Sequence, residues 1–164
     1  MSTHICCDRQ LPTIIKRLTA YQNPAPIRLR IVTMHIKEFE VEDGRRFSDT
    51  ILKLRTYKDA TVSILVDRKW ILRAKLKNGG NNPQFIQDLE DMGVRIMAVR
   101  GLHAKIIFLS SGKRKALLVG SANFTSTALH KQHEADVYFD NDNLHVIDEM
   151  DKYITKLYQN AVPV

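Results

Sequence analysis

The sequence contains little cysteine and no long hydrophobic run. Its two cysteines, Cys6 and Cys7, are adjacent, and such a pair forms neither a disulfide framework nor a zinc site. No apolar run approaches the ~18 residues of a membrane span, and the N-terminus lacks the charged-then-apolar pattern of a signal peptide. There is no internal repeat and no low-complexity linker. We therefore expect a cytoplasmic protein without a membrane partner, built as a single domain over residues 1–164, with residues 1–10 loosely ordered.

The charge of the chain is more informative than its size. A length of 164 residues with 44% hydrophobic residues suits one domain with a proper core. Lysine and arginine together number 25 against 18 aspartate and glutamate residues, which gives a formal net charge of +7. A basic surface favours polyanions, of which nucleic acid is the commonest. Many basic proteins nevertheless bind no nucleic acid, so composition alone leaves both possibilities open.

Apolar residues recur at helical and at strand spacing in alternating segments. Helices are predicted where apolar residues recur every three or four positions, at 11–18, 48–57, 82–92 and 144–157. Strands are predicted where they alternate or form short runs, at 27–36, 61–66, 94–99, 103–109, 116–119 and 134–140. Residues 67–80 form a long basic segment to which no element is assigned. This alternation predicts an α/β fold, a layered sandwich whose central sheet, mainly parallel or mixed, is flanked by helices.

Four polar residues stand out around the two neighbouring strands in the second half of the chain. His103 and Lys105 are two residues apart, and so are Ser121 and Asn123. Side chains two apart on a strand share a face, and the polar connection 110–115 suits a hairpin that pairs the strands. The pairing would bring an imidazole, an ammonium, a hydroxyl and an amide onto one patch. Such a patch can hold and attack a phosphodiester.

At these residues the chain resembles the phospholipase D superfamily. The HKD motif of that family reads H-x-K, four residues, D, and then G-S-x-N, and His103-Ala104-Lys105 and Gly120–Asn123 match it. Ser110 occupies the position of the motif aspartate, which in the family is more a structural residue than a reacting one. Glu134 stands where many single-motif nucleases of the group carry an acid. His35-Ile36-Lys37 also fits H-x-K, but no G-S-x-N follows it, so it is not a second motif.

The resemblance implies a metal-independent phosphodiesterase, most specifically a nuclease for DNA or RNA. His103 would form a covalent phosphohistidine, while Lys105, Ser121 and Asn123 bind the non-bridging oxygens. Glu134 would hold a catalytic histidine in its tautomer and charge. No metal and no cofactor is implied, since clustered acids of a two-metal site are missing and Lys105 would serve as the fixed cation. Family members with one motif pair two chains, which implies a homodimer with the active site at the interface.

Each of these residues also has a plainer interpretation. A lone histidine near a strand is usually structural, and Ser121 and Asn123 could be ordinary turn residues. A lysine that points inward needs an anionic partner, which is either a substrate phosphate or Glu134. Glu134 could equally be a solvated acid at a strand entry. The joint occurrence of His103, Lys105 and the GSxN sequence favours the functional interpretation.

Further residues are candidates for binding the substrate. His35 follows the first strand and could line the pocket, and Gly120 belongs to the GSxN turn. Basic residues with an available aromatic ring suit a nucleic-acid track, in which cations neutralise phosphates and the ring stacks on a base. The candidate track residues are Trp70, Arg73, Lys75, Lys77, Lys113, Arg114 and Lys115. The alternative is that Trp70 packs into the core and the cations form an ordinary solvated surface.

Two rival functions remain. A phospholipid or small-phosphodiester hydrolase is possible because the superfamily includes both, although the charge of +7 and the lack of an apolar membrane-docking stretch count against it. A non-catalytic nucleic-acid-binding module is conceivable because Ser110 replaces the motif aspartate. Cleavage assays separate these possibilities from the nuclease.

Overall fold

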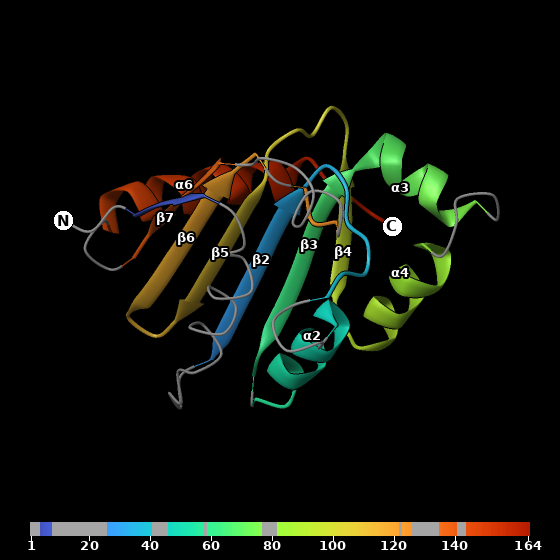
Figure 1. Cartoon of the computed structure of the whole chain (residues 1–164), viewed down its shortest axis with the longest axis horizontal. Coiled ribbons are helices and arrows are strands. Elements are labelled where there is room, and N and C mark those ends of the chain that lie inside the picture. Colours follow the sequence, from blue (N-terminus) through green and yellow to red (C-terminus); the bar gives the residue numbers. More distant parts are fainter. Residues whose placement is uncertain are drawn as a thin grey trace.

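A computed structural model gives the structure of residues 4–7, 26–40, 46–57, 59–76, 82–121, 123–125, 135–140 and 144–164. One sheet runs through the molecule with the strand order β1-β7-β6-β5-β2-β3-β4-β8 (Figure 1). The strands are β1 (His4–Cys7), β2 (Ile27–Thr33), β3 (Thr61–Asp67), β4 (Arg95–Val99), β5 (Ile106–Ser111), β6 (Arg114–Gly120), β7 (Ala135–Phe139) and β8 (Val162–Pro163). The helices described are α2 (Phe47–Arg55), α3 (Arg68–Lys75), α4 (Asn82–Asp91) and α6 (Leu144–Gln159).

The sheet is mixed, with a parallel centre. Strands β2, β3 and β4 are parallel, and helices connect them, as a parallel crossover requires. The other pairings are antiparallel, including β2 with β5 and the β5–β6 hairpin. The predicted α/β class with a parallel or mixed sheet is therefore confirmed, although among the described strands only β2, β3 and β4 pair in parallel.

Two hydrophobic cores lie on the two faces of the sheet. Alternate strand residues point to opposite faces, so Ile31 packs with the α2, α3 and α4 side, whereas Val32 packs with Ile147 and Ile154 of α6. Figure 1 shows α2 and α4 in front of the sheet and α6 behind it. Because both faces are covered, β3 and β4 are short apolar runs in the sequence, which is why they were predictable. Strand β2 was predicted instead from its alternation of apolar residues with Arg28 and Arg30.

Helix α3 is the main element that the sequence analysis missed. Asp67 caps its N-terminus, accepting hydrogen bonds from the backbone N–H groups of Lys69 (2.9 Å) and Trp70 (3.1 Å). Only Ile71 and Ala74 of this helix are buried. Its apolar stripe is thus too short to be recognised within a basic segment.

The ends of the chain also differ from expectation. The sequence predicts a loosely ordered end over residues 1–10, but His4–Cys7 forms β1 and pairs with β7. Val162 and Pro163 add the short edge strand β8 beside β4. The helix predicted at 11–18 lies outside the described residues, whereas α6 follows the predicted stripe closely.

Candidate active site

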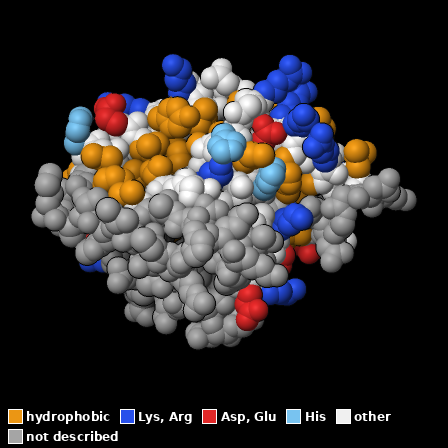
Figure 2. Space-filling model, turned by 45° about the horizontal axis from the view of Figure 1, so that its top comes forward, with side chains coloured by type: hydrophobic (Ala, Val, Ile, Leu, Met, Phe, Trp, Pro, Cys, Tyr) orange, Lys and Arg blue, Asp and Glu red, His pale blue; other side chains and the backbone are white. Residues whose placement is uncertain are grey.

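The motif residues lie at the sheet edge where the parallel strands end. Because β5 runs antiparallel to β2, its first residue, Ile106, pairs with Val32 near the end of β2. Ile106 also pairs with Val119, next to the end of β6. The segments after β2, before β5 and after β6 therefore converge at one edge. Figure 2 shows histidine side chains on this side of the molecule, with hydrophobic side chains and Lys and Arg side chains around them.

His103 and Lys105 are in direct contact. They precede β5 rather than lying within it, as the sequence analysis had placed them. The Nζ of Lys105 is 3.0 Å from Nδ1 and 3.4 Å from Nε2 of His103. Lys105 is buried, with 6% of its surface exposed, whereas His103 is exposed. Because an ammonium only donates hydrogen bonds, the ring nitrogen that it contacts acts as an acceptor. A fixed cation thus stands beside an imidazole that a substrate can reach.

The GSxN segment joins this pair through the backbone. The N–H of Gly120 donates to the carbonyl oxygen of Lys105 at 3.0 Å. Ser121 follows at once and is exposed, while Asn123 is half-buried. The side-chain oxygen of Asn123 is buried and has no hydrogen-bond partner among the described residues. Buried polar atoms are nearly always paired in proteins, so Asn123 holds an unused hydrogen-bonding group in this segment.

His35 belongs to the same edge. The backbone N–H of Lys37 donates to the carbonyl oxygen of Phe124 at 2.9 Å, which ties the segment after β2 to the GSxN segment. The ring of His35 lies 5.8 Å from that of Trp70, with a tilt of 34°. Burial lowers the pKa of His35 below its ordinary value. Asp67 opposes this effect, whereas the nearby charges of Lys105, Lys37 and His103 add to it.

Asp67 is a site residue that the sequence analysis missed. Besides capping α3 through Oδ1, it accepts a hydrogen bond from the N–H of Leu102 through Oδ2, at 3.2 Å. One carboxylate therefore links the start of α3 to the residue before His103. The sequence offered one clue, an aspartate directly after a strand, which is common at helix N-termini.

The predicted basic track is not one surface. Arg73 and Lys75 are exposed on α3, and Lys75 lies 3.6 Å from Glu90. Trp70 is half-buried and packs against the core as well as against His35. Lys113, Arg114 and Lys115 lie at the β5–β6 hairpin, which is the opposite end of β5 from His103. Six residues of strand, roughly 20 Å, separate the two ends.

Two predicted site residues, Glu134 and Lys77, lie outside the described residues. In the part of the chain that the structure describes, no group of His, Cys, Asp and Glu side chains is arranged to hold a metal ion. None of the helices described is long and apolar enough to cross a membrane.

The fold and the contacts at this edge define a phospholipase D-like phosphodiesterase fold. A family model for the PLD-like domain of cardiolipin synthase matches residues 20–158, so the chain belongs to this PLD-like family. NucT from Helicobacter pylori is similar in structure, with a TM-score of 0.69, 14% identity and coverage of 99% of both chains. Nuc, a phospholipase D family member from Salmonella typhimurium, has a TM-score of 0.62 and 14% identity, with 99% of this chain and 97% of that chain covered.

Larger proteins contain the same fold. Phosphatidylserine synthase from Haemophilus influenzae matches 98% of this chain over 38% of its own length, with a TM-score of 0.66 and 15% identity. No curated protein matches the sequence. At these identities the structural matches establish the fold and leave the substrate open.

Proposed function

We propose that the chain is a metal-independent phosphodiester hydrolase that cleaves nucleic acid, with His103 as its nucleophile. The observation that carries this proposal is the contact between Nζ of buried Lys105 and Nδ1 of exposed His103, at 3.0 Å. It occurs within a domain that belongs to the PLD-like family. A preorganised cation beside an accessible nucleophile is suited to the charge that develops on a phosphoryl group under attack.

The reaction would proceed in two displacements. His103 attacks phosphorus, one P–O bond of the diester breaks, and a second histidine in its cationic form gives a proton to the leaving oxygen. A P–N bond then holds the phosphoryl group on His103. The same second histidine takes a proton from water, which attacks phosphorus and releases His103. Lys105, Ser121 and Asn123 bind the non-bridging oxygens in both steps.

The second histidine would come from a partner chain. The chain carries one H-x-K with a following G-S-x-N, so a symmetric dimer would supply the partner subunit's His103 as the proton donor. Two-fold dimers are the commonest oligomers. In this arrangement Glu134 would fix the tautomer of one of the two histidines.

Charge supports nucleic acid as the substrate. The net charge of +7 attracts polyanions. Helix α3, which Asp67 caps and which includes Trp70, exposes Arg73 and Lys75. The ring of Trp70 lies beside His35 at the candidate active site. Phosphates of a bound strand could contact α3 while the scissile phosphate reaches His103.

A phospholipid diester is the second candidate, because two leucines are exposed at α3, one within the helix and one directly after it. Leu72 and Leu76 are 60% and 64% exposed, and Arg73 and Lys75 lie between them. An exposed apolar pair among cations is typical of helices that dock on anionic lipid surfaces. The matching family model is also that of cardiolipin synthase.

One panel of assays distinguishes these functions. The protein is incubated in excess EDTA with each of several substrates, and His103→Ala is the control. The substrates are labelled single- and double-stranded DNA and RNA, and phosphatidylglycerol vesicles. Cleavage of a nucleic acid that His103→Ala loses supports the proposal. Cleavage of the lipid alone would establish the second candidate. Nucleic-acid binding without cleavage would indicate a non-catalytic module, and cleavage only after addition of magnesium would contradict the metal-independent mechanism.

A further inference from the structure

A pocket of about 490 Å³ lies at the other end of the parallel strands, away from His103. Its walls include Arg28, Arg30, Arg55 and Arg95, and none of the described residues that line it is acidic. Arg28 and Arg95 stand at the beginnings of β2 and β4, whereas His35 follows the end of β2. The seven residues of β2 separate the two sites by roughly 20 Å.

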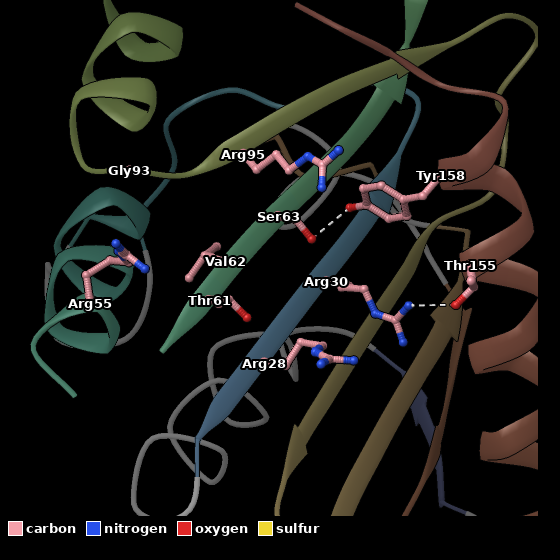
Figure 3. A pocket seen from close by; sticks show the side chains of 10 residues that line it. All are labelled: Arg28, Arg30, Arg55, Thr61, Val62, Ser63, Gly93, Arg95, Thr155 and Tyr158. Carbon is pink, nitrogen blue, oxygen red and sulfur yellow. Dashed lines mark hydrogen bonds between the residues drawn. The ribbon is translucent and has the colours of Figure 1, made fainter. Parts of the chain in front are cut away.

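The sheet register explains why these arginines come together. Arg30 pairs with Ser63, and Ser63 pairs with Arg95. Residues paired across neighbouring strands point to the same face, so both arginines project toward α6, and Arg28, two residues before Arg30, does the same. Figure 3 shows the guanidinium groups of these three arginines directed toward α6. Arg55 reaches the pocket from α2, close to Gly93.

Helix α6 neutralises only some of the cations that it faces. Asp148 pairs with Lys115, and Asp151 pairs with Arg30, which also donates to Thr155 and lies over the ring of Phe108. One helical turn further on, α6 presents Thr155 and Tyr158 in place of acids. The hydroxyl of Tyr158 donates to Ser63 at 3.0 Å (Figure 3). Beyond Asp151, α6 therefore carries no carboxylate on the turns that line the pocket.

Three of the four pocket arginines have no carboxylate partner in the part of the chain that the structure describes. Among the described residues, no acidic side chain forms an ion pair with Arg28, Arg55 or Arg95. Arg55 is held in place by two backbone carbonyl oxygens, those of Met92 (3.2 Å) and Ala60. The pKa of Arg30 is lowered first by its burial and next by the nearby charge of Arg28. Like charges are thus concentrated at one place, where Arg30 alone of the four arginines has a carboxylate partner among the described residues, Asp151.

A tight turn keeps this space open. Gly93 ends α4 with a φ of +77°, a conformation that favours glycine. A Cβ at this position would stand 3.0 Å from Nη2 of Arg55. A Cβ would require the Arg55 guanidinium to shift by a few tenths of an ångström, and the positive φ would strain any other residue, so glycine suits this position beside the cation.

We propose that this arginine pocket binds the phosphate monoester of a nucleotide, as a second anion site separate from the candidate active site. A phosphate monoester carries a charge of about −1.5 to −2 at neutral pH, which matches the unpaired guanidinium groups. Guanidinium groups bind phosphate oxygens in bidentate fashion. The volume of about 490 Å³ is that of a small-ligand site, and the ring of Tyr158 offers an apolar surface to a base. This inference does not depend on the proposed function, because it uses none of its residues.

The test measures binding by isothermal titration calorimetry in excess EDTA. The probes are adenosine 5′-monophosphate, adenosine, and a short oligonucleotide with either a 5′-phosphate or a 5′-hydroxyl. The test variant is Arg28→Gln/Arg95→Gln, and the matched control is Lys53→Gln/Lys152→Gln, which removes the same charge from exposed positions elsewhere. A third variant, Lys105→Met, reports on binding at the candidate active site. Folding of each variant is checked by circular dichroism.

Adenosine monophosphate should bind the native chain and the control alike, adenosine should not bind, and the test variant should bind at least tenfold more weakly. Lys105→Met should retain this binding. If the 5′-phosphorylated oligonucleotide binds as tightly as adenosine monophosphate, the ligand is the 5′-phosphate of a nucleic-acid strand. If the oligonucleotide does not bind, the ligand is a free nucleotide. Three results would each overturn the proposal. Neither adenosine monophosphate nor the 5′-phosphorylated oligonucleotide binds, or the test variant binds with unchanged affinity, or Lys105→Met loses the binding.

A second measurement is independent of how the variants fold. When the native chain is titrated with adenosine monophosphate, the amide resonances of Ser63, Gly93 and Thr155 should shift in NMR spectra. Shifts confined to Gly120 and Ser121 would place the phosphate at the candidate active site and contradict the pocket.

Discussion

Lys105 and His103 touch, but only the lysine is withdrawn from water. Burying an ammonium is costly in free energy, and its charge is suited to hold a substrate phosphate beside His103. The environment of Lys105 therefore supports a function in holding charge, whereas exposed His103 is placed to react. This difference in burial could not be predicted from an H-x-K spacing.

Replacing Lys105 with methionine tests this role. Met keeps the unbranched stem and removes the charge, so the fold should survive. Turnover should fall by about 10²–10³, on the order of 3 kcal/mol of transition-state stabilisation. Steady-state kinetics on the best substrate of the assay panel, together with circular dichroism, make the measurement. Turnover near that of the native chain in a folded Lys105→Met protein would remove this residue from the mechanism.

His35 should give the fold a dependence on pH. Burial lowers its pKa below the ordinary value of 6.5, so the unfolded chain takes up a proton at a higher pH than the folded chain. The contribution of His35 to the free energy of unfolding should therefore decline as the pH falls below about 6.5, until the folded state is protonated as well.

Urea unfolding between pH 7.5 and 5 measures this effect as a difference between variants. His35→Gln should be less sensitive to pH than the native chain, and His145→Gln, which changes an exposed histidine on α6, serves as the control. Identical pH profiles for His35→Gln and the native chain would show that His35 does not titrate differently on folding.

Among the secondary-structure elements, α3 departs most from the sequence analysis. Its two buried residues, Ile71 and Ala74, lie between basic residues in the sequence, so no apolar stripe was recognised. Its N-cap residue, Asp67, also accepts a hydrogen bond from the backbone of Leu102. Strand β2, by contrast, was predicted from its alternation of apolar residues with arginines, and β3 from its short apolar run. Local patterns identify an element that buries a long stripe, but they do not show which loop a capping side chain reaches.

Asp67 should affect both stability and turnover. Asp67→Ala should lower the free energy of unfolding by about 0.5–2 kcal/mol through loss of the cap, and it should lower kcat because the segment before His103 loses its hydrogen bond. Asp67→Ser keeps a capping oxygen but lacks the second acceptor. We expect Ser at this position to restore stability in urea unfolding while leaving kcat low; recovery of both together would mean that Asp67 acts only through the stability of the helix.

The arginine pocket illustrates what only the assembled sheet reveals. The alternation of 27–36 placed Arg28 and Arg30 on one side of a strand, but Arg95 belongs to another strand. Their convergence depends on register and on where the acids of α6 end.

The clustering of His103 and Lys105 with the GSxN segment was predictable because hairpin pairing is local. The position of the basic hairpin at the opposite edge follows from the direction of β5, which spacing does not specify.

For the whole molecule, the central expectation concerns assembly. Two chains should pair so that both His103 residues face one phosphorus, and light scattering should give twice 18.9 kDa. A mixed dimer with one His103→Ala chain should be almost inactive, because neither the nucleophile nor the proton donor suffices alone. Full activity at concentrations where only monomer is detected would reject the dimer. His35, which lies at the same sheet edge, would then be the first candidate for the second histidine.

The most direct test of the account is to trap the covalent intermediate. The protein is mixed with a labelled oligonucleotide in excess EDTA, quenched with alkali within the first turnovers, and digested for mass spectrometry. The account predicts a phosphoryl adduct on the nitrogen of His103, labile in acid and absent from Lys105→Met at the same early time. Two results would contradict the proposed role of His103 as nucleophile. One is steady cleavage with no adduct on His103 at any time in the first turnovers, and the other is an adduct on another residue.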